Sequence, residues 1–207
     1  MNGDFTAEEE RILKKLNTPA KIQDFLNTIP ANFEREGDTC FSPRMVLQKN
    51  RAQCMEGAMF AATALRMYGH QPLVLDLETS DKDFAHVIAV FQTGKLWGAI
   101  SKSNHASLRF RDPVYMTIRE LVMSYFHEYF NDNGFKTLRS YSRPVDLARF
   151  DKRGWMTSEK PVWYIPEYLA KIPHIPIAPK SAIRQLRRAD EIEIQAGKLV
   201  EWKAKVD

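Results

Sequence analysis

The sequence predicts an α+β fold, in which helices at the start of the chain are followed by an antiparallel sheet. Apolar residues recur at helical spacing in three stretches of the first 69 positions. Beyond them come three short apolar runs, residues 71–77, 86–91 and 96–101, and a glycine-containing turn separates the last two. With 207 residues, 44% of them hydrophobic, the chain is long enough to bury one sizeable core.

Two amphipathic helices are predicted at the start of the chain. Thr6 and Glu9 have the spacing of a capping box, which begins the first helix. Pro19 is predicted to be the first residue of the second helix, and Pro30 is predicted to end that helix. We expect both helices to cover the core rather than to carry chemistry. Their apolar faces consist of Ile12, Leu13, Leu16, Ile22, Phe25, Leu26 and Ile29.

The stretch from Asn50 to Gly69 is predicted to be a buried helix with Cys54 in its first turn. Its many small residues allow other elements to approach closely, and Gly69 is placed to end it. A helix N-terminus favours an anion, so we expect this position to lower the pKa of the thiol. Cys54 is therefore a candidate nucleophile. The alternative is a small buried core residue, as most free cysteines are.

A histidine opens the second apolar run, and a reactive thiol needs such a partner. His86 begins a stretch rich in β-branched residues, which continues to Phe91 and the turn that follows. Two apolar runs around a turn that contains Gly94 predict a β-hairpin. If Phe91 pairs with Leu96 across a four-residue turn, His86 faces Ser101, with the two side chains about 5 Å apart.

The order of these features resembles the transglutaminase-like superfamily, whose domains are related to papain-like cysteine proteases. The matching residues are Cys54 with its helix, His86, and the turn and strand from Gly94 to Trp97. The resemblance covers Pro43 to Tyr115. It implies a core in which a cysteine-bearing helix packs on an antiparallel sheet. It also implies a catalytic cysteine, a histidine on one strand and an acidic residue on the next.

The third member of this arrangement departs from the resemblance. Ser101 stands where the acidic residue is expected, and a serine cannot stabilise an imidazolium as a carboxylate does. Asn104 is a second candidate. Asp112 is the one we favour, and it requires residues 106–111, which alternate in polarity, to form an additional strand. His105 lies nearby, and we expect it at the surface or in a polar network.

The second half of the chain is predicted to support this core. Residues 114–130 have the pattern of a long amphipathic helix. We divide the chain into a domain of residues 1–150 with its helical cover, and an arm of residues 151–207 docked on it. The arm is rich in proline and aromatic residues, and it is also a possible oligomer contact. Residues 192–206 alternate around Gly197, which predicts a small hairpin.

Composition and charge narrow the classes of function. The net charge of +4 is small, and apart from the basic segment Lys180–Arg188 the charges are mixed, so we do not expect nucleic-acid binding. No apolar run is long enough to span a membrane, and Met1–Phe5 does not begin a secretory signal. Two cysteines make no disulfide framework, so we expect a cytoplasmic protein. Cys40 lies in a predicted loop, and it is too poorly spaced from Cys54 for a metal site.

These observations predict a thiol-dependent enzyme that acts on a peptide, an amide or another acyl substrate. Cys54 would attack the acyl carbonyl, His86 would take the thiol proton, and the thioester would pass to water or to an amine. The oxyanion would be stabilised by the Cys54 backbone N–H and a side chain of the preceding loop, for which the candidates are Gln48, Asn50 and Gln53. We expect no cofactor and no metal. The alternative function is an inactive binding module with the same fold.

Overall fold

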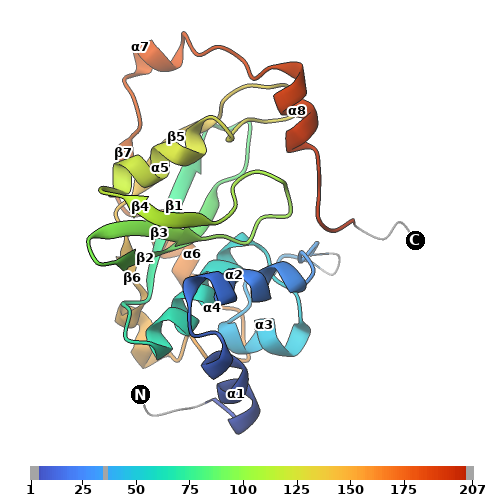
Figure 1. Cartoon of the computed structure of the whole chain (residues 1–207), viewed down its shortest axis with the longest axis vertical. Coiled ribbons are helices and arrows are strands. Elements are labelled where there is room, and N and C mark those ends of the chain that lie inside the picture. The colour runs from blue at the N-terminus through green and yellow to red at the C-terminus, as the bar shows by residue number, and fades with distance from the viewer. Residues whose placement is uncertain (1–4, 35–36, 204–207) are drawn as a thin grey trace.

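One open antiparallel sheet of seven strands carries helices on both faces (Figure 1). The computed structural model describes residues 5–34 and 37–203; the first four residues, on which part of the targeting prediction rests, lie outside them. The helices are α1 (Ala7–Lys15), α2 (Pro19–Thr28), α3 (Pro43–Lys49), α4 (Cys54–Met67), α5 (Ile118–Phe126), α6 (Tyr164–Leu169), α7 (Lys180–Ile183), α8 (Glu191–Gly197) and the 3-10 helix η1 (Leu147–Arg153). The strands are β1 (Leu73–Thr79), β2 (His86–Thr93), β3 (Leu96–Ile100), β4 (Arg111–Tyr115), β5 (Leu138–Ser142), β6 (Val145–Asp146) and β7 (His174–Pro176).

The sheet has the order β4-β3-β2-β1-β5-β7, and β6 pairs with β1. Side chains alternate along β2 between two core layers, because successive residues of a strand point to opposite faces. Val87 and Ala89 pack in the layer that contains α4, whereas Ile88 and Val90 pack in the layer that contains α5. The sequence prediction of an α+β protein with an antiparallel sheet is confirmed at this level.

Helix α4 is the central element of the larger core layer. Every residue from Met55 to Leu65 is buried, and the predicted helix is confirmed, with its end at Met67 just before Gly69. A Cβ atom at Gly57 would lie 2.4 Å from the Lys102 Cβ, so only glycine allows the Lys102 backbone to pass this close to the first turn. The close approach that the small residues predicted therefore occurs beside Cys54.

The hairpin of β2 and β3 is confirmed, but its predicted register is wrong. Thr93 pairs with Leu96, so the turn has two residues and Gly94 adopts a positive φ of 62°. Phe91 pairs with Gly98 instead of Leu96, and its ring fills the place that a Cβ at Gly98 would take, 2.6 Å away. A shift of two residues keeps each side chain on its predicted face.

The segment after β3 differs from the prediction. Residues 106–111 do not form a strand; Leu108 has a φ of +58°, and the next strand, β4, begins only at Arg111. The predicted helix of residues 114–130 is shorter, because Thr117 caps its start together with Glu120. The predicted helix began too early because the apolar pattern continues into the edge strand β4, which ends at Tyr115.

The last part of the chain joins both core layers. Trp155 is fully buried beside α4, and Ile175 of β7 pairs with Tyr141 of β5. The predicted hairpin around Gly197 is wrong, because Asp190 and Glu193 form a capping box that starts α8 instead. The part of that hairpin beyond Lys203 lies outside the described residues.

Candidate functional site

Cys54 and His86 line one hollow of about 1020 Å³. Cys54 is the first residue of α4, and His86 is the first residue of β2, so the hollow lies where both elements begin. Its remaining walls come from five loops and from one side of α8, and they include Phe33, Asp83, Phe84, Asn104, Leu108, Tyr129, Ile194 and Gly197. The cysteine and the histidine that the sequence predicted as a pair therefore line the same hollow.

The Cys54 thiol is half-buried at the N-terminus of α4. Its Sγ lies 3.9 Å from the Gln53 Oε1 atom, and the backbones of Val87 and Met55 hydrogen-bond the sulfur. Burial raises the pKa of the thiol above its ordinary value, and those two backbone hydrogen bonds offset only part of the effect. The predicted lowering of the thiol pKa is therefore wrong, because desolvation outweighs the helix N-terminus.

His86 is buried and hydrogen-bonded to the predicted serine. Its Nε2 atom lies 2.7 Å from Ser101 Oγ, and that hydroxyl donates to the Leu108 carbonyl at 2.5 Å. Because the hydroxyl hydrogen is committed to the carbonyl, Ser101 accepts from His86, which places the imidazole proton on Nε2 and leaves Nδ1 unprotonated. Burial lowers the pKa of His86 to about 4, so the ring is neutral near pH 7.

The sheet faces explain how the two side chains reach one hollow. His86 pairs with Leu77, which packs in the α5 layer, so the imidazole belongs to the face opposite α4. Val87, the next residue, faces α4 and gives its backbone to the Cys54 sulfur. The two side chains therefore reach the hollow from opposite faces of the sheet, near the start of β2.

The other candidates for a third member lie elsewhere. Asp112 is exposed on the edge strand β4, and it is not among the residues that line the hollow. Asn104 lines the hollow, but its amide hydrogen-bonds the backbone of Trp202 in both directions. His105 is exposed, with Nδ1 3.0 Å from the Gly197 carbonyl oxygen. Ser101 alone touches His86.

The predicted side chains for an oxyanion hole do not converge on the thiol. Gln53 lines the hollow, yet its amide nitrogen donates to Glu34 and to the Thr39 carbonyl. Gln48 and Asn50 are exposed, and neither lines the hollow. The donors that face the sulfur are backbone groups, which sequence patterns do not reveal.

A buried carboxylate that the sequence analysis missed fixes the start of α4. Glu56 is fully buried and accepts hydrogen bonds from Thr39 Oγ1 and the Phe41 N–H, each at 2.8 Å, and from Asn32. It also accepts from the Gln53 N–H at 2.8 Å. These bonds hold the Cys54 turn in place. The signal was available, since a glutamate three residues after the N-cap is typical of a capping box.

Lys102 is a second buried polar residue beside the hollow that the sequence analysis missed. Its Nζ donates to the carbonyls of Leu26 and Ile29 at 2.8 and 2.6 Å, at the end of α2. Burial lowers the pKa of Lys102 to about 8. The lysine therefore ties α2 to the wall of the hollow, as basic residues do at helix C-termini.

The chain has another buried histidine, which carries the carboxylate partner that His86 lacks. His174 Nε2 lies 2.9 Å from Asp76 Oδ2, and its Nδ1 lies 2.9 Å from the Ile172 carbonyl oxygen. Both ring nitrogens are thus engaged, so this ring has no free lone pair to act as a base. In the sequence, Asp76 stands out only because it interrupts the apolar run of residues 71–77.

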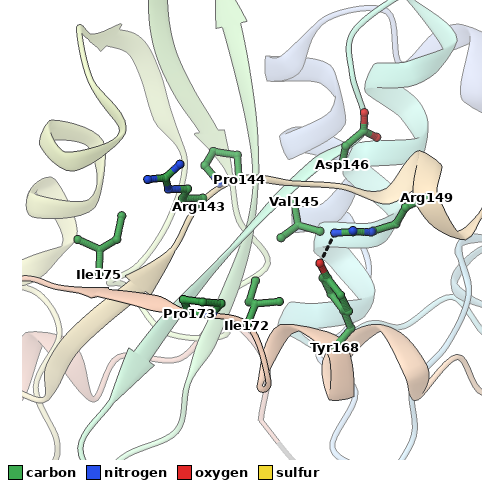
Figure 2. Close-up of a pocket in the computed structure, with 9 residues that line it drawn as sticks. All are labelled: Arg143, Pro144, Val145, Asp146, Arg149, Tyr168, Ile172, Pro173 and Ile175. Carbon is green, nitrogen blue, oxygen red and sulfur yellow. Dashed lines mark hydrogen bonds between the residues drawn. The ribbon is translucent and has the colours of Figure 1, made fainter.

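A second hollow of about 760 Å³ lies beside β6 and α6 (Figure 2). Arg149 donates a hydrogen bond to the Tyr168 hydroxyl there, and Val145, Ile172 and Ile175 supply apolar walls. Its lining residues include no cysteine and no histidine. The chemistry therefore points to the hollow of Cys54.

Other sequence features carry little chemistry. Burial raises the pKa of the Cys40 thiol to about 12, so that cysteine is inert. In the basic segment, Arg187 pairs with Asp190 and Arg188 lies over the Phe135 ring. Among the described residues, no three His, Cys, Asp or Glu side chains are grouped to hold a metal ion.

In comparisons with known proteins, no protein-family model matches the chain, and no curated protein sequence resembles it significantly. Of the helices in residues 5–34 and 37–203, none has the length and apolar character needed to cross a bilayer. The transglutaminase-like resemblance stays a prediction from residue order.

Proposed function

We propose that this protein transfers acyl groups through the Cys54 thiol, with His86 as the general base, on a transglutaminase-like core. The observation that supports the proposal is the shared hollow, which is lined both by a cysteine at a helix N-terminus and by a buried histidine. Ser101 fixes the tautomer of that histidine and leaves Nδ1 free to accept a proton. Neither Cys40 nor His174 offers an equivalent pair.

The proposed reaction has two steps. In the first, the Cys54 sulfur attacks the acyl carbonyl carbon while Nδ1 of His86 takes the thiol proton. The tetrahedral intermediate expels an amine or alcohol, which leaves with the proton from His86, and a thioester remains on Cys54. In the second, water or an amine attacks the thioester with His86 again as base, and the thiol is regenerated.

The resting protein holds both partners neutral. Burial raises the pKa of the Cys54 thiol and lowers the pKa of His86 to about 4, so transfer of the proton from sulfur to the imidazole before attack is unfavourable. A standing thiolate–imidazolium pair is therefore not populated. The proton must move as the sulfur attacks, or after a substrate has changed the surroundings of the pair.

The neutral state of both partners favours a second candidate function, an inactive binding module that uses the same hollow. No carboxylate contacts His86 within the described residues, and its only side-chain partner there is the neutral Ser101. A thiol with a raised pKa beside such a histidine is a poor nucleophile until something activates it. The binding module would use the hollow without turnover.

Acetylation by p-nitrophenyl acetate separates these two candidates. An active pair acetylates Cys54, which peptide mass spectrometry locates, and releases p-nitrophenolate. We expect His86→Ala to slow acetylation by about 10²- to 10⁴-fold, since that is the usual contribution of a general base. Addition of an amine then shows whether the thioester is hydrolysed or transferred.

His105→Ala is the matched control, because His105 lines the same hollow without touching the pair. Its rate should stay within about threefold of the wild type, on the scale of a surface substitution. If Cys54 is not acetylated, or if both histidine variants react at the wild-type rate, the enzyme proposal is wrong and the binding module stands. His86→Gln, which keeps a polar side chain, replaces His86→Ala if the latter does not fold.

A further inference from the structure

The segment after α8 lies against the rim of the hollow through one antiparallel β-bridge and the backbone hydrogen bonds on either side of it. We call residues 198–203 the strap. Val200 forms an antiparallel bridge with His105, and the Ala106 N–H donates to the Leu199 carbonyl at 3.0 Å. The Glu201 N–H donates to the Asn104 carbonyl at 2.8 Å. This is the hydrogen-bond pattern by which an extended peptide joins an exposed edge.

Asn104 extends that pairing with its side chain. Its Oδ1 accepts the Trp202 N–H at 2.9 Å, and its Nδ2 donates to the Trp202 carbonyl at 3.0 Å. One amide side chain thus satisfies both backbone groups of one strap residue. Such contacts recognise an extended backbone whatever side chains it carries.

The strap side chains add little apolar burial of their own. Leu199 is 64% exposed and Val200 is 38% exposed, so backbone hydrogen bonds hold this part of the strap. Strands held this way, with exposed side chains, open at low free-energy cost compared with core strands. Another chain of extended shape could take the same place.

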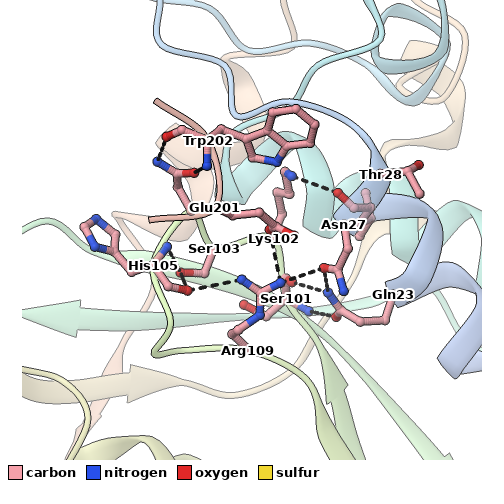
Figure 3. Close-up of polar contacts among 12 residues, drawn as sticks. Gln23, Asn27, Thr28, Ser101, Lys102, Ser103, His105, Arg109, Glu201 and Trp202 are labelled. Carbon is pink, nitrogen blue, oxygen red and sulfur yellow. Dashed lines mark hydrogen bonds and ion pairs between the residues drawn. The ribbon is translucent and has the colours of Figure 1, made fainter. Parts of the chain in front are cut away.

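Two side chains of the strap nevertheless indicate which peptide fits. Arg109 pairs with Glu201 at 3.1 Å, and it is itself held by Asn27 Oδ1 at 3.1 Å (Figure 3). Trp202 lines a neighbouring hollow of about 460 Å³ together with Phe33. The Trp202 ring forms part of the wall of this hollow, and its buried indole N–H has no hydrogen-bond partner among the described groups.

We propose that the loop around Asn104, with Arg109 and the Trp202 hollow, is a docking track for an extended peptide. The peptide carries an acidic residue followed directly by an aromatic one, and the strap occupies the track in cis. The track adjoins the Cys54 hollow, because Asn104 and His105 line both it and that hollow. The inference rests on the strap contacts alone and holds whether or not Cys54 reacts.

A labelled copy of the strap tests the track in the full-length protein. The probe is fluorescein-labelled Lys-Leu-Val-Glu-Trp-Lys amide, the sequence of residues 198–203. In the wild type the strap competes at the high effective concentration of a tethered segment. Glu201→Pro removes the N–H that bonds Asn104 and the carboxylate that pairs with Arg109, which frees the track. We expect this variant to bind the probe at least about tenfold more tightly than the wild type, by fluorescence anisotropy.

Matched variants show whether the track itself binds the probe. In the Glu201→Pro background, Asn104→Ala should weaken binding at least about tenfold, because two hydrogen bonds are lost. Asn133→Ala, another asparagine that lines the hollow, should leave binding unchanged. A probe with Phe for Trp should bind as well as the original, and one with Lys for Glu should bind more weakly.

Equal binding by the wild type and the folded Glu201→Pro variant would overturn the proposal, as would equal effects of the two asparagine variants. If Glu201→Pro does not fold, Glu201→Lys makes the same test by reversing the charge beside Arg109. Because the readout is binding, it is independent of acetylation at Cys54. The two proposals can therefore fail separately.

Discussion

Two buried histidines in this chain have opposite surroundings. Within residues 5–34 and 37–203, His86 has a single side-chain hydrogen-bond partner, the neutral hydroxyl of Ser101, and no partner at its other ring nitrogen. His174 has an oxygen at each ring nitrogen, and one of them belongs to the Asp76 carboxylate. The ring with the carboxylate is locked into the fold, whereas the ring without it can accept a proton.

The difference teaches that a histidine–carboxylate pair does not mark the reactive site in this protein. The His174 pair joins β7 to β1 across β5, so it fastens the last strand to the sheet. Burial raises the pKa of the Asp76 carboxyl, although the adjacent His174 acts in the opposite direction. In the proposed reaction His86 would act instead as a neutral ring, and the following predictions test the contrast between the two histidines.

The largest effect is expected from breaking the His174 pair. His174→Ala leaves the Asp76 carboxylate buried without its partner, and losing one member of a buried pair costs about 3–5 kcal/mol. Urea unfolding measures this loss. The double variant with Asp76→Ala should be more stable than the sum of the two single losses implies. Additive losses would show that the pair contributes no coupling, and the contrast with His86 would fail.

The next largest effect is expected from low pH, which lowers the stability of the fold through His86. The unfolded chain protonates this histidine near pH 6.5, whereas the folded chain does so only near pH 4. The folded state therefore binds fewer protons in this window, so its stability falls as the pH drops from 6.5 to 4, by up to about 3 kcal/mol. His86→Asn removes this part of the acid sensitivity. The difference in unfolding free energy between wild type and variant should change by that amount between pH 7 and pH 4.5, and a constant difference would contradict the buried neutral ring.

A smaller effect is expected from Ser101→Ala. The substitution leaves the His86 Nε2–H and the Leu108 carbonyl without their shared partner, which costs about 1–3 kcal/mol. It also removes the group that fixes the tautomer, so acetylation of Cys54 should slow as well. His105→Ala, at an exposed ring, should change stability by only about 0.5 kcal/mol in the same unfolding series. Equal losses for the two variants would show that Ser101 has no special role.

Much of the site could be predicted from sequence, because it depends on short-range patterns. The Cys54 helix followed from its small apolar residues, and the contact between His86 and Ser101 followed from hairpin alternation. That prediction survived a register error of two residues, since such a shift keeps both side chains on one face. Local patterns are robust in this way.

The rest depended on contacts between distant parts of the chain. Burial raised the Cys54 pKa against the expected effect of the helix N-terminus, and burial cannot be read from one helix. The expected role of Asp112 failed to gain support because Leu108 turns the chain before β4. The strap next to Asn104 joins residues nearly a hundred positions apart.

The most direct test of the account is a titration of the His86 imidazole by nuclear magnetic resonance, with His86→Asn to assign its signals. The account predicts a pKa of about 4 and a proton on Nε2 at neutral pH. Such a ring is neutral, is oriented by Ser101, and leaves Nδ1 unprotonated. A pKa at or above 6.5, or a proton on Nδ1, would contradict it.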